Sequence, residues 1–178
     1  MRKSVLMPVV TILVAMAILL GLNFGLSGLR ESIAQKELQE KMLQILPGST
    51  SFAEEPYTGQ DANVVSVHKA ENGYVILTQT QGYVDVIQML VAVSNEGKVV
   101  GLQIRDMHET WGLGGESWTD WQFLNQFSGT DGTAEVGVNI DAITGATVTS
   151  KAVTRCINSA VAVVTGADTG TGATSWGG

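Results

Sequence analysis

The sequence predicts an α+β fold, in which a twisted antiparallel sheet with flanking helices follows a single N-terminal transmembrane helix. Three features support this class. An uncharged apolar run opens the chain, Val- and Ile-rich runs separated by tight-turn signals fill its middle, and an amphipathic helical pattern follows them. A chain of 178 residues is long enough for one such domain and an anchor.

The N-terminal run extends from Val5 to Leu29 and holds 25 residues without a charge. As a helix it would measure about 37 Å, enough to cross about 30 Å of hydrocarbon. Arg2 and Lys3 precede it, which predicts a single pass through the cell inner (cytoplasmic) membrane with the N-terminus cytoplasmic and the domain extracytoplasmic. A cleaved signal peptide is the alternative, but its apolar core holds only about 7 to 15 residues.

The chain is expected to divide into four parts. Residues 1–30 are the membrane anchor, 31–47 an amphipathic linker helix, 48–166 the folded domain, and 167–178 a flexible Gly- and Thr-rich tail. Glu37 and Lys41 form a favourable i, i+4 pair on the linker helix, and Pro47-Gly48 ends it. Its apolar stripe packs either on the domain or on another protein of a complex.

Four Val- and Ile-rich runs predict an antiparallel meander. They are Val64 to His68, Tyr74 to Gln79, Val84 to Val93 and Lys98 to Ile104. Asn72-Gly73 predicts a tight turn between the first two runs, and Asn95-Glu96-Gly97 a turn between the last two.

Two helical patterns follow the strands. Ser117 is expected to cap a short helix whose apolar residues belong to the core, namely Trp118, Trp121, Phe123, Leu124 and Phe127. The longer helix ends at Gly166 and carries one apolar face: Ala152, Val153, Cys156, Ile157, Ala160, Val161 and Val164. Cys156, the one cysteine of the sequence, is expected to be a buried packing thiol, since alone it makes neither an internal disulfide nor an iron–sulfur cluster.

Charge and motif content exclude several functions. The formal net charge is −7, and Arg2 and Lys3 are the only charges in residues 1–29, so the domain is acidic. An acidic domain argues against nucleic acid as a partner, because that needs a basic footprint. The sequence contains no evident acid–base dyad, nucleophile–base pair or metal-ligand cluster, so no catalytic or metal-binding residue is predicted.

The stretch Asp141–Ser150 carries the functional argument. A predicted strand, Val136 to Ile140, leads into a small-residue turn that opens the long helix. The hydroxyls of Thr147, Thr149 and Ser150 are expected to cap the N–H groups at the helix start. Such a start favours an anion, and a phosphate suits the Thr147 hydroxyl. The alternative is an ordinary capped helix after a turn.

The pattern Asp141-x-x-Thr144-Gly145-Ala146-Thr147 resembles the flavinylation motif of the covalent FMN-binding subunits. These are the G subunit of the Rnf complex, an ion-translocating ferredoxin:NAD oxidoreductase, and the C subunit of the sodium-translocating NADH:quinone reductase. In that family a flavin transferase joins the FMN phosphate to the last Thr of the motif as a phosphoester. The resemblance implies FMN attached through its phosphate to Thr147, and Asp141 serving the transferase. Residues implied beside the cofactor are Thr144, Gly145, Ala146, Val148 and Thr149.

A second glycine-rich segment, His108 to Gly114, leaves the fourth predicted strand. It is similar to the His-x-Glu-Thr-Pro-Gly-Leu-Gly loop that the family places next to FMN, although one residue between His and Glu is missing and Trp111 replaces Pro. The residues implied beside the flavin ring are Glu109, Thr110, Gly112, Leu113 and Gly114. The two loops are expected to converge on one flavin. A loop that merely turns the chain is the alternative, whereas a zinc-protease site lacks its second His.

Two further features bear on the flavin. Gly82-Tyr83 resembles the Gly-Tyr that opens the same strand in the family, and packing is a stronger expectation for Tyr83 than a flavin contact. The tail repeats the motif as Asp168-x-x-Thr171-Gly172-Ala173-Thr174, so Thr174 is a rival attachment point. Thr147 is preferred, because a strand is predicted before it and a helix after it.

The resemblance implies an electron-transfer subunit that relays electrons between other membrane subunits of an Rnf-type complex and has no independent catalytic site. FMN holds one or two electrons, and the protein positions and tunes it. Chain length favours the Rnf protein over its longer quinone-reductase counterpart. A membrane-anchored FMN-binding sensory or assembly module without electron flux is one alternative, and a structural adaptor without cofactor is another.

Overall fold

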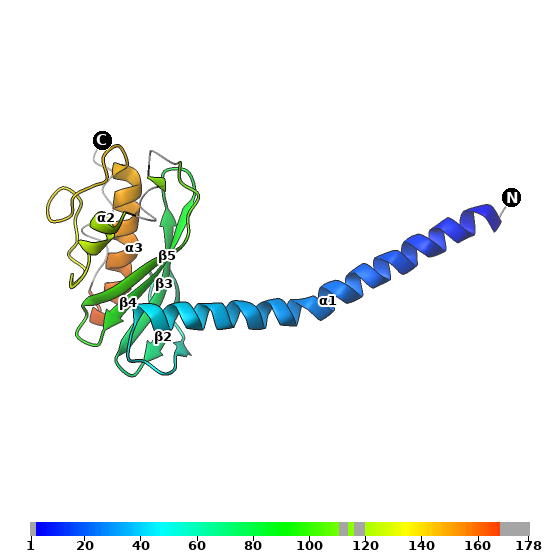
Figure 1. The fold of residues 1–178 in the computed structure, drawn as a ribbon, viewed down its shortest axis with the longest axis horizontal. Coiled ribbons are helices and arrows are strands. Elements are labelled where there is room, and N and C mark those ends of the chain that lie inside the picture. Colours follow the sequence, from blue (N-terminus) through cyan, green and yellow to red (C-terminus); the bar gives the residue numbers. More distant parts are fainter. Residues whose placement is uncertain (1–2, 111–113, 116–119, 168–178) are drawn as a thin grey trace. The chain divides into compact units, whose positions relative to one another are not determined.

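The computed structural model describes residues 3–110, 114–115 and 120–167. The chain divides into two compact units, Met1–Lys41 and Met42–Gly178. The second unit contains the sheet and the C-terminal helix, and it holds every residue of the predicted flavin site that the structure describes (Figure 1).

The first element, α1, is one continuous helix over Lys3–Ile45. Lys41 Nζ lies 2.8 Å from Glu37 Oε1, which confirms the predicted i, i+4 pair. The helix ends just before Pro47-Gly48, as expected. Among the residues that the structure describes, no helix combines the length and the apolar character needed to cross a membrane. The N-terminal anchor therefore stays a prediction.

A five-stranded antiparallel sheet with the order β1-β2-β3-β4-β5 forms the centre of the second unit. Its strands are β1 Ala53–Glu55, β2 Val64–Ala70, β3 Gly73–Gln81, β4 Val86–Ser94 and β5 Val99–Asp106. The four predicted strands and the meander are confirmed, as is the tight turn at Asn72-Gly73, where Ala70 pairs with Gly73. The short β1 was missed, because three residues are too few to show an alternating pattern.

The main core lies between one face of the sheet and α3, which spans Thr147–Thr165 (Figure 1). It is formed by Val67, Ile76, Ile87, Met89, Val91, Val93, Val99, Ile104, Phe123, Phe127, Ala134, Ile140, Ala152, Val153, Cys156, Ile157, Ala160 and Val161. The predicted apolar face of the helix is therefore its buried face, and Gly166 ends the helix in the left-handed conformation with φ 68°. Cys156 is fully buried, which confirms the predicted packing thiol, and this burial raises its pKa to about 12.

The opposite face of the sheet is also buried. Val75, Leu77, Leu90 and Ala92 share this face by strand alternation, and the last turn of α1 and the residue after it supply the buried Met42 and Leu46. Gly101 on β5 makes room for this turn, because a side chain there would collide with the carbonyl oxygen of Ile45. The end of the linker helix thus packs on the domain.

The aromatic helix differs from its prediction. α2 spans only Trp121–Asn125, and its N-cap is Asp120, whose Oδ1 accepts from Phe123 N–H at 2.9 Å. The predicted cap Ser117 and the aromatic Trp118 lie outside the described residues. Phe123 and Phe127 are buried and meet edge to face, with centroids 5.3 Å apart. Trp121 is 74% exposed, so its assignment to the core was wrong: a helix this short buries only one side.

The predicted strand at Val136–Ile140 was also wrong. The segment curls into a turn in which the Glu135 carbonyl accepts from the N–H groups of Val138, Asn139 and Ile140 at 3.1–3.2 Å. Asn139 locks the turn, since its Oδ1 accepts from Glu135 N–H at 2.7 Å. These backbone donors are used locally, so they cannot serve a strand ladder.

His68 on β2 is expected to make stability depend on pH. Burial lowers its pKa below the ordinary value of 6.5, although the charge of Glu54 partly opposes this. The stability that neutral His68 contributes is therefore complete above pH 6.5 and is lost as pH falls below it, because the unfolded chain binds the proton first. Urea midpoints measured on both sides of pH 6.5 test this. His68→Gln should flatten the dependence.

Candidate functional site

The turn that precedes α3 is held by its own backbone and by Ser150. Ala146 N–H donates to Ile143 O at 2.9 Å, and Gly145 adopts φ 78°, which favours glycine. The Ser150 hydroxyl accepts from Ile143 N–H at 3.1 Å and donates to Ala146 O at 2.9 Å. Ser150 thus bridges both ends of the turn and fixes where the helix begins.

Hydroxyl capping of α3 was predicted, and this was wrong. The N-cap is Ala146, and no side chain of the described residues caps the helix start. Ser150 is committed to the turn, and Thr149 donates its hydroxyl to Glu109. The first turn of α3 therefore offers backbone N–H groups and the positive end of the helix dipole to an outside acceptor.

The motif residues around the start of α3 differ in exposure. Thr144, Gly145 and Thr147, the first residue of α3, are exposed. Val148 is half-buried, and Ala146 is buried. A Cβ built on Gly145 meets no atom within 4 Å, so space is open beside the turn. These features fit the phosphate of FMN: an exposed hydroxyl, uncapped N–H donors and room for a bulky group stand together.

The two glycine-containing loops are in contact, while their convergence on one flavin stays a prediction. Thr149 Oγ1 on α3 donates to Glu109 Oε2 at 2.7 Å. Gly114, with φ 130°, lies so close to α3 that a Cβ there would be 2.9 Å from Thr149 Cβ. Thr110 is exposed, and its carbonyl accepts from Gly115 N–H at 3.1 Å. Trp111, Gly112 and Leu113 lie outside the described residues.

The turn from β3 to β4 also belongs to this site, through a contact with Glu109 that the sequence did not indicate. Glu109 accepts from the backbone N–H groups of Tyr83, Val84 and Asp85. Tyr83 is 63% exposed, so the expectation that its side chain packs against the protein was wrong. No local pattern could reveal this contact, because Glu109 is 24 to 26 residues away from its three partners.

Gln126 is a second residue that sequence reasoning missed. Its Oε1 accepts from Asp141 N–H at 2.7 Å, and its Nε2 donates to Asp141 O at 3.2 Å. The paired bonds tie the first residue of the motif to the end of α2 and leave Asp141 exposed.

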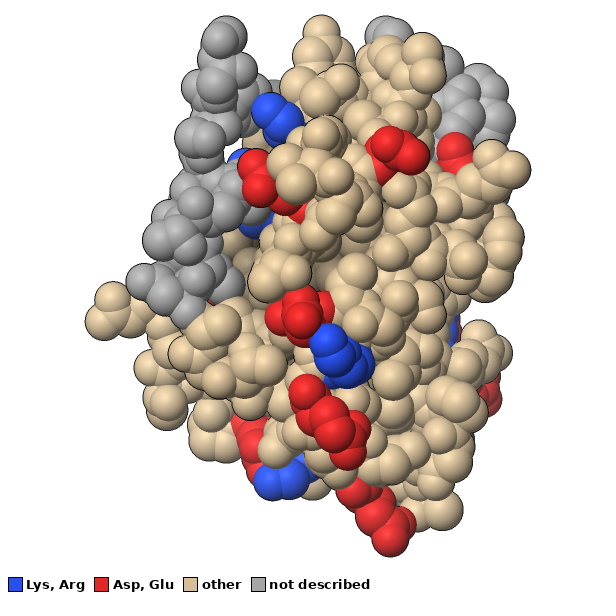
Figure 2. Space-filling view, turned by 90° about the vertical axis from the view of Figure 1, so that its left-hand side faces the viewer, with Lys and Arg blue, Asp and Glu red and all other residues tan. Residues whose placement is uncertain are grey.

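Charged groups flank the second loop. The His108 side chain is 71% exposed, and its Nδ1 lies 3.6 Å from Asp106 Oδ1 and 3.7 Å from Asp85 Oδ2. In the described parts of the chain, no three His, Cys, Asp or Glu side chains are grouped so that they could hold a metal ion. Figure 2 shows acidic side chains and a few basic ones side by side on one face, an arrangement unlike the continuous basic surface that nucleic acid requires.

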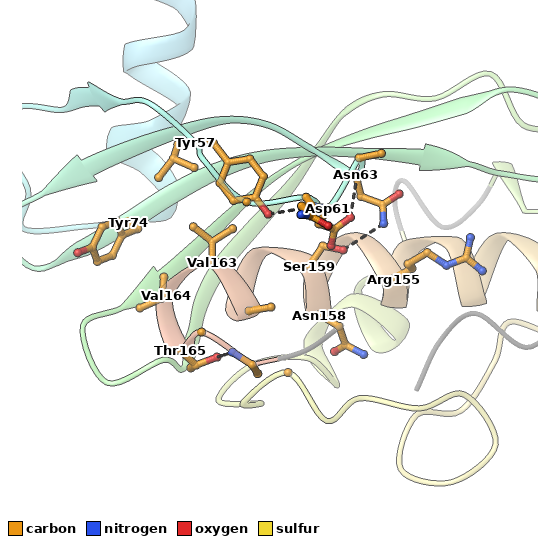
Figure 3. A pocket seen from close by; sticks show the side chains of 18 of the residues that line it. Tyr57, Asp61, Asn63, Tyr74, Arg155, Asn158, Ser159, Val163, Val164 and Thr165 are labelled. Carbon is orange, nitrogen blue, oxygen red and sulfur yellow. Dashed lines mark hydrogen bonds between the residues drawn. The ribbon is translucent and has the colours of Figure 1, made fainter. Parts of the chain in front are cut away.

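A cavity of about 1070 Å³ lies elsewhere, between the C-terminal half of α3 and the segments before β2 and after α2 (Figure 3). None of the motif residues Asp141–Ser150 lines it. Asn63 Nδ2 donates to Ser159 Oγ at 3.3 Å, and Asn158 exchanges two hydrogen bonds with the backbone of Ala134. These polar groups hold the two segments on α3, so the exposed hydroxyl at the helix start is the better candidate for chemistry.

Comparison with known proteins supports the same region. A sequence model described as FMN-binding domain matches residues 82–162, from the β3–β4 turn into α3. The G subunit of an ion-translocating oxidoreductase complex from Methanosarcina acetivorans is 31% identical over 174 residues, covering 89% of this chain and 92% of the relative. The chain belongs to the G-subunit family of ion-translocating oxidoreductase complexes. The segment that matches the FMN-binding domain contains both glycine loops.

Other members of the G-subunit family match over a shorter length. The G subunit of the proton-translocating ferredoxin:NAD(+) oxidoreductase complex of Clostridium ljungdahlii is 41% identical over 99 residues, 52% of this chain and 53% of that protein. Its counterpart in the Na(+)-translocating ferredoxin:NAD(+) oxidoreductase complex of Acetobacterium woodii is 38% identical over 102 residues, 51% and 48% of the two chains. The chain thus spans about half the length of these two relatives.

Proposed function

We propose that this G-subunit protein carries FMN on Thr147 and relays electrons between other subunits of an Rnf-type ferredoxin:NAD oxidoreductase complex. The observation that carries the proposal is an exposed Thr147 hydroxyl at the uncapped start of α3, inside the segment that matches FMN-binding domains. The names of the relatives supply the ferredoxin:NAD complex and its coupling to ion translocation.

Each of the two loops is assigned to one part of the cofactor, the phosphate or the flavin ring. The first-turn N–H groups of α3 would hold the FMN phosphate, and Thr147 would carry it as a phosphoester. For this ester to form, the flavin transferase would cleave the pyrophosphate of a flavin dinucleotide, so that the Thr147 oxygen replaces the nucleoside monophosphate, which leaves. Thr144, Gly145, Ala146, Val148 and Thr149 form the surroundings of the phosphate. Thr110 and Gly114 would lie on the side of the flavin ring. When bound, FMN supplies one- and two-electron chemistry, which the chain itself lacks.

The covalent bond suits the proposed location. Residues 1–30 anchor the chain in the cytoplasmic membrane with the N-terminus inside, residues 31–47 link the anchor to the FMN-binding domain, 48–166, and residues 167–178 form a tail. The charge-free run from Val5 to Leu29 supports the anchor. On the extracytoplasmic side a dissociating FMN would be lost, and a phosphoester prevents this loss.

Electron flux distinguishes the proposal from a sensory or assembly module. In the purified complex with reduced ferredoxin and NAD, the flavin on this protein is expected to be reduced and reoxidised within the time of one turnover. Stopped-flow absorbance of the flavin measures this. A flavin that stays oxidised during steady turnover would support the module without electron flux.

Gln126 is expected to assist flavin attachment by holding Asp141. Gln126→Ala removes both hydrogen bonds to the Asp141 backbone, and at about 1 kcal/mol for each bond, about 2 kcal/mol in all, the attachment rate should fall about thirtyfold. The initial rate of flavinylation by purified transferase measures the effect. Gln122→Ala, an exposed change on the same helix, is the matched control and should react like the wild type. Equal rates for both variants would contradict a role for the two hydrogen bonds between Gln126 and Asp141 in flavin attachment.

A further inference from the structure

The carboxylate of Glu109 is saturated by donors from the protein itself. Oε1 accepts from Val84 N–H at 2.9 Å and from Asp85 N–H at 3.3 Å. Oε2 accepts from Thr149 Oγ1 at 2.7 Å and from Tyr83 N–H at 3.2 Å. Each oxygen thus has two donors, which leaves little acceptor capacity for a flavin.

The β3–β4 turn is shaped around this carboxylate. Gly82 N–H donates to Asp85 O at 2.9 Å, which closes the turn and points three successive N–H groups at Glu109. A Cβ on Gly82 would lie 2.5 Å from Glu109 Oε1, so a glycine is needed for this approach. Meanwhile the tip presents Tyr83 and Val84 to solvent, 63% and 53% exposed. The turn is held by the carboxylate rather than by burial of its side chains.

Three segments that are distant in sequence therefore meet at one side chain. They are the β3–β4 turn, the loop after β5 and the first turn of α3, where Thr149 lies two residues beyond Thr147. We infer that Glu109 is a positioning residue: it holds the start of α3 and the exposed β3–β4 tip in one arrangement and places a negative charge beside the flavin. This inference rests on the proposed function.

Two consequences separate this role from a merely structural one. A fixed carboxylate near a flavin disfavours the added negative charge of the reduced flavin, so its removal should shift the midpoint potential in the positive direction. Loss of the hydrogen bonds, in contrast, should loosen the start of α3, which carries the attachment residue Thr147, and so lower the fraction of protein that is loaded with flavin. Charge and hydrogen bonds are separable by substitution, because an amide is nearly isosteric with a carboxylate.

Three variants separate these effects. Glu109→Gln removes the charge but keeps an oxygen for Val84 and Asp85 and an amide group that donates to the Thr149 hydroxyl. Glu109→Ala removes all four bonds. Thr149→Val removes only the link to α3. Asp106→Asn is the control. Asp106 is the last residue of β5, its carboxylate is exposed, and it takes no part in the four hydrogen bonds of Glu109.

The first experiment needs no flavin. In the full chain carrying Thr147→Ala, hydrogen exchange is measured at the amides of Tyr83, Val84 and Asp85. Glu109→Ala should speed exchange at all three about fivefold or more, as expected for the loss of a bond of about 1 kcal/mol. Glu109→Gln should speed Tyr83 alone, and Asp106→Asn should change nothing. Unchanged exchange in Glu109→Ala would overturn the inference that Glu109 holds the β3–β4 turn.

The second experiment uses chains with Thr147 intact and the flavin transferase. Glu109→Ala and Thr149→Val should lower the flavin-loaded fraction, Glu109→Gln should restore it, and the restored protein should show a more positive midpoint potential than the wild type or Asp106→Asn. Wild-type loading and potential in every variant would overturn the positioning role. A wild-type chain that takes up no flavin would overturn both the proposed function and the positioning role of Glu109. The exchange result would still show that Glu109 holds the β3–β4 turn.

Discussion

Substitution of Thr147 by Ala is expected to abolish the fluorescent flavin band of this protein on a denaturing gel. The Thr147 hydroxyl is the exposed nucleophile at the start of α3, and Ala removes the atom to which the phosphate is joined. The loss should be complete, because a phosphoester needs that oxygen. Intact mass should fall from the flavinylated value to that of the bare chain.

Two controls accompany this result: the melting temperature of Thr147→Ala, and the variant Thr174→Ala in the tail. The Thr147 side chain caps nothing in the described structure, and Ala is the better helix former, so the melting temperature should stay unchanged or rise slightly. Thr174→Ala, in the second copy of the motif, should keep the full fluorescent band. Peptide mass mapping that found flavin on Thr174 alone would contradict the assignment to Thr147, and a wild-type chain with bare mass would leave a tethered scaffold without cofactor.

Ile157→Ala is expected to lower the free energy of unfolding by about 2–5 kcal/mol, the range for removing a large aliphatic side chain from a packed core. Ile157 is fully buried on α3, among the side chains of the sheet and the aromatic pair of the α2 region. The remaining cavity cannot close readily, because the sheet on one side and the helix backbone on the other fix its walls. Urea unfolding followed by circular dichroism gives the difference.

Lys151→Ala is the matched control for the core substitution. Lys151 lies on the exposed side of the same helix, so its removal should change stability by no more than about 0.5 kcal/mol. If both substitutions cost the same, α3 would not be the helix that closes the core. Because α3 also carries Thr147, Ile157→Ala should lower flavin loading at temperatures where the variant begins to unfold.

The strands, the hairpin turns and the long helix were predictable because their signals are local. Val- and Ile-rich alternation marks β2 to β5, and Asn72-Gly73 supplies the turn that joins the first pair. The three-four spacing through Cys156 and Ile157 selected the buried face of α3. In each case the residues that decide the structure are within a few positions of one another.

Errors arose where composition or spacing fits more than one local structure and the contacts made in the fold decide between them. Trp121 has the spacing of a core residue, yet α2 is too short to bury it. Val136–Ile140 has the composition of a strand, but Glu135 and Asn139 take its backbone bonds into a turn. The hydroxyls at the start of α3 have the pattern of caps, but Ser150 and Thr149 bond to the preceding turn and to Glu109 instead.

The amino-acid sequence by itself determined the antiparallel meander, the amphipathic α3 and the motif that ends in Thr147, because periodicity and turn chemistry act over short stretches of chain. Only the tertiary structure decided that Glu109 joins the β3–β4 turn, 24 to 26 residues before it, to Thr149 of α3, 40 residues after it, and that Gln126 holds Asp141. The physical reason is that a hydrogen bond depends on the positions of two atoms in space, and folding brings these atoms together without leaving a pattern in either local segment.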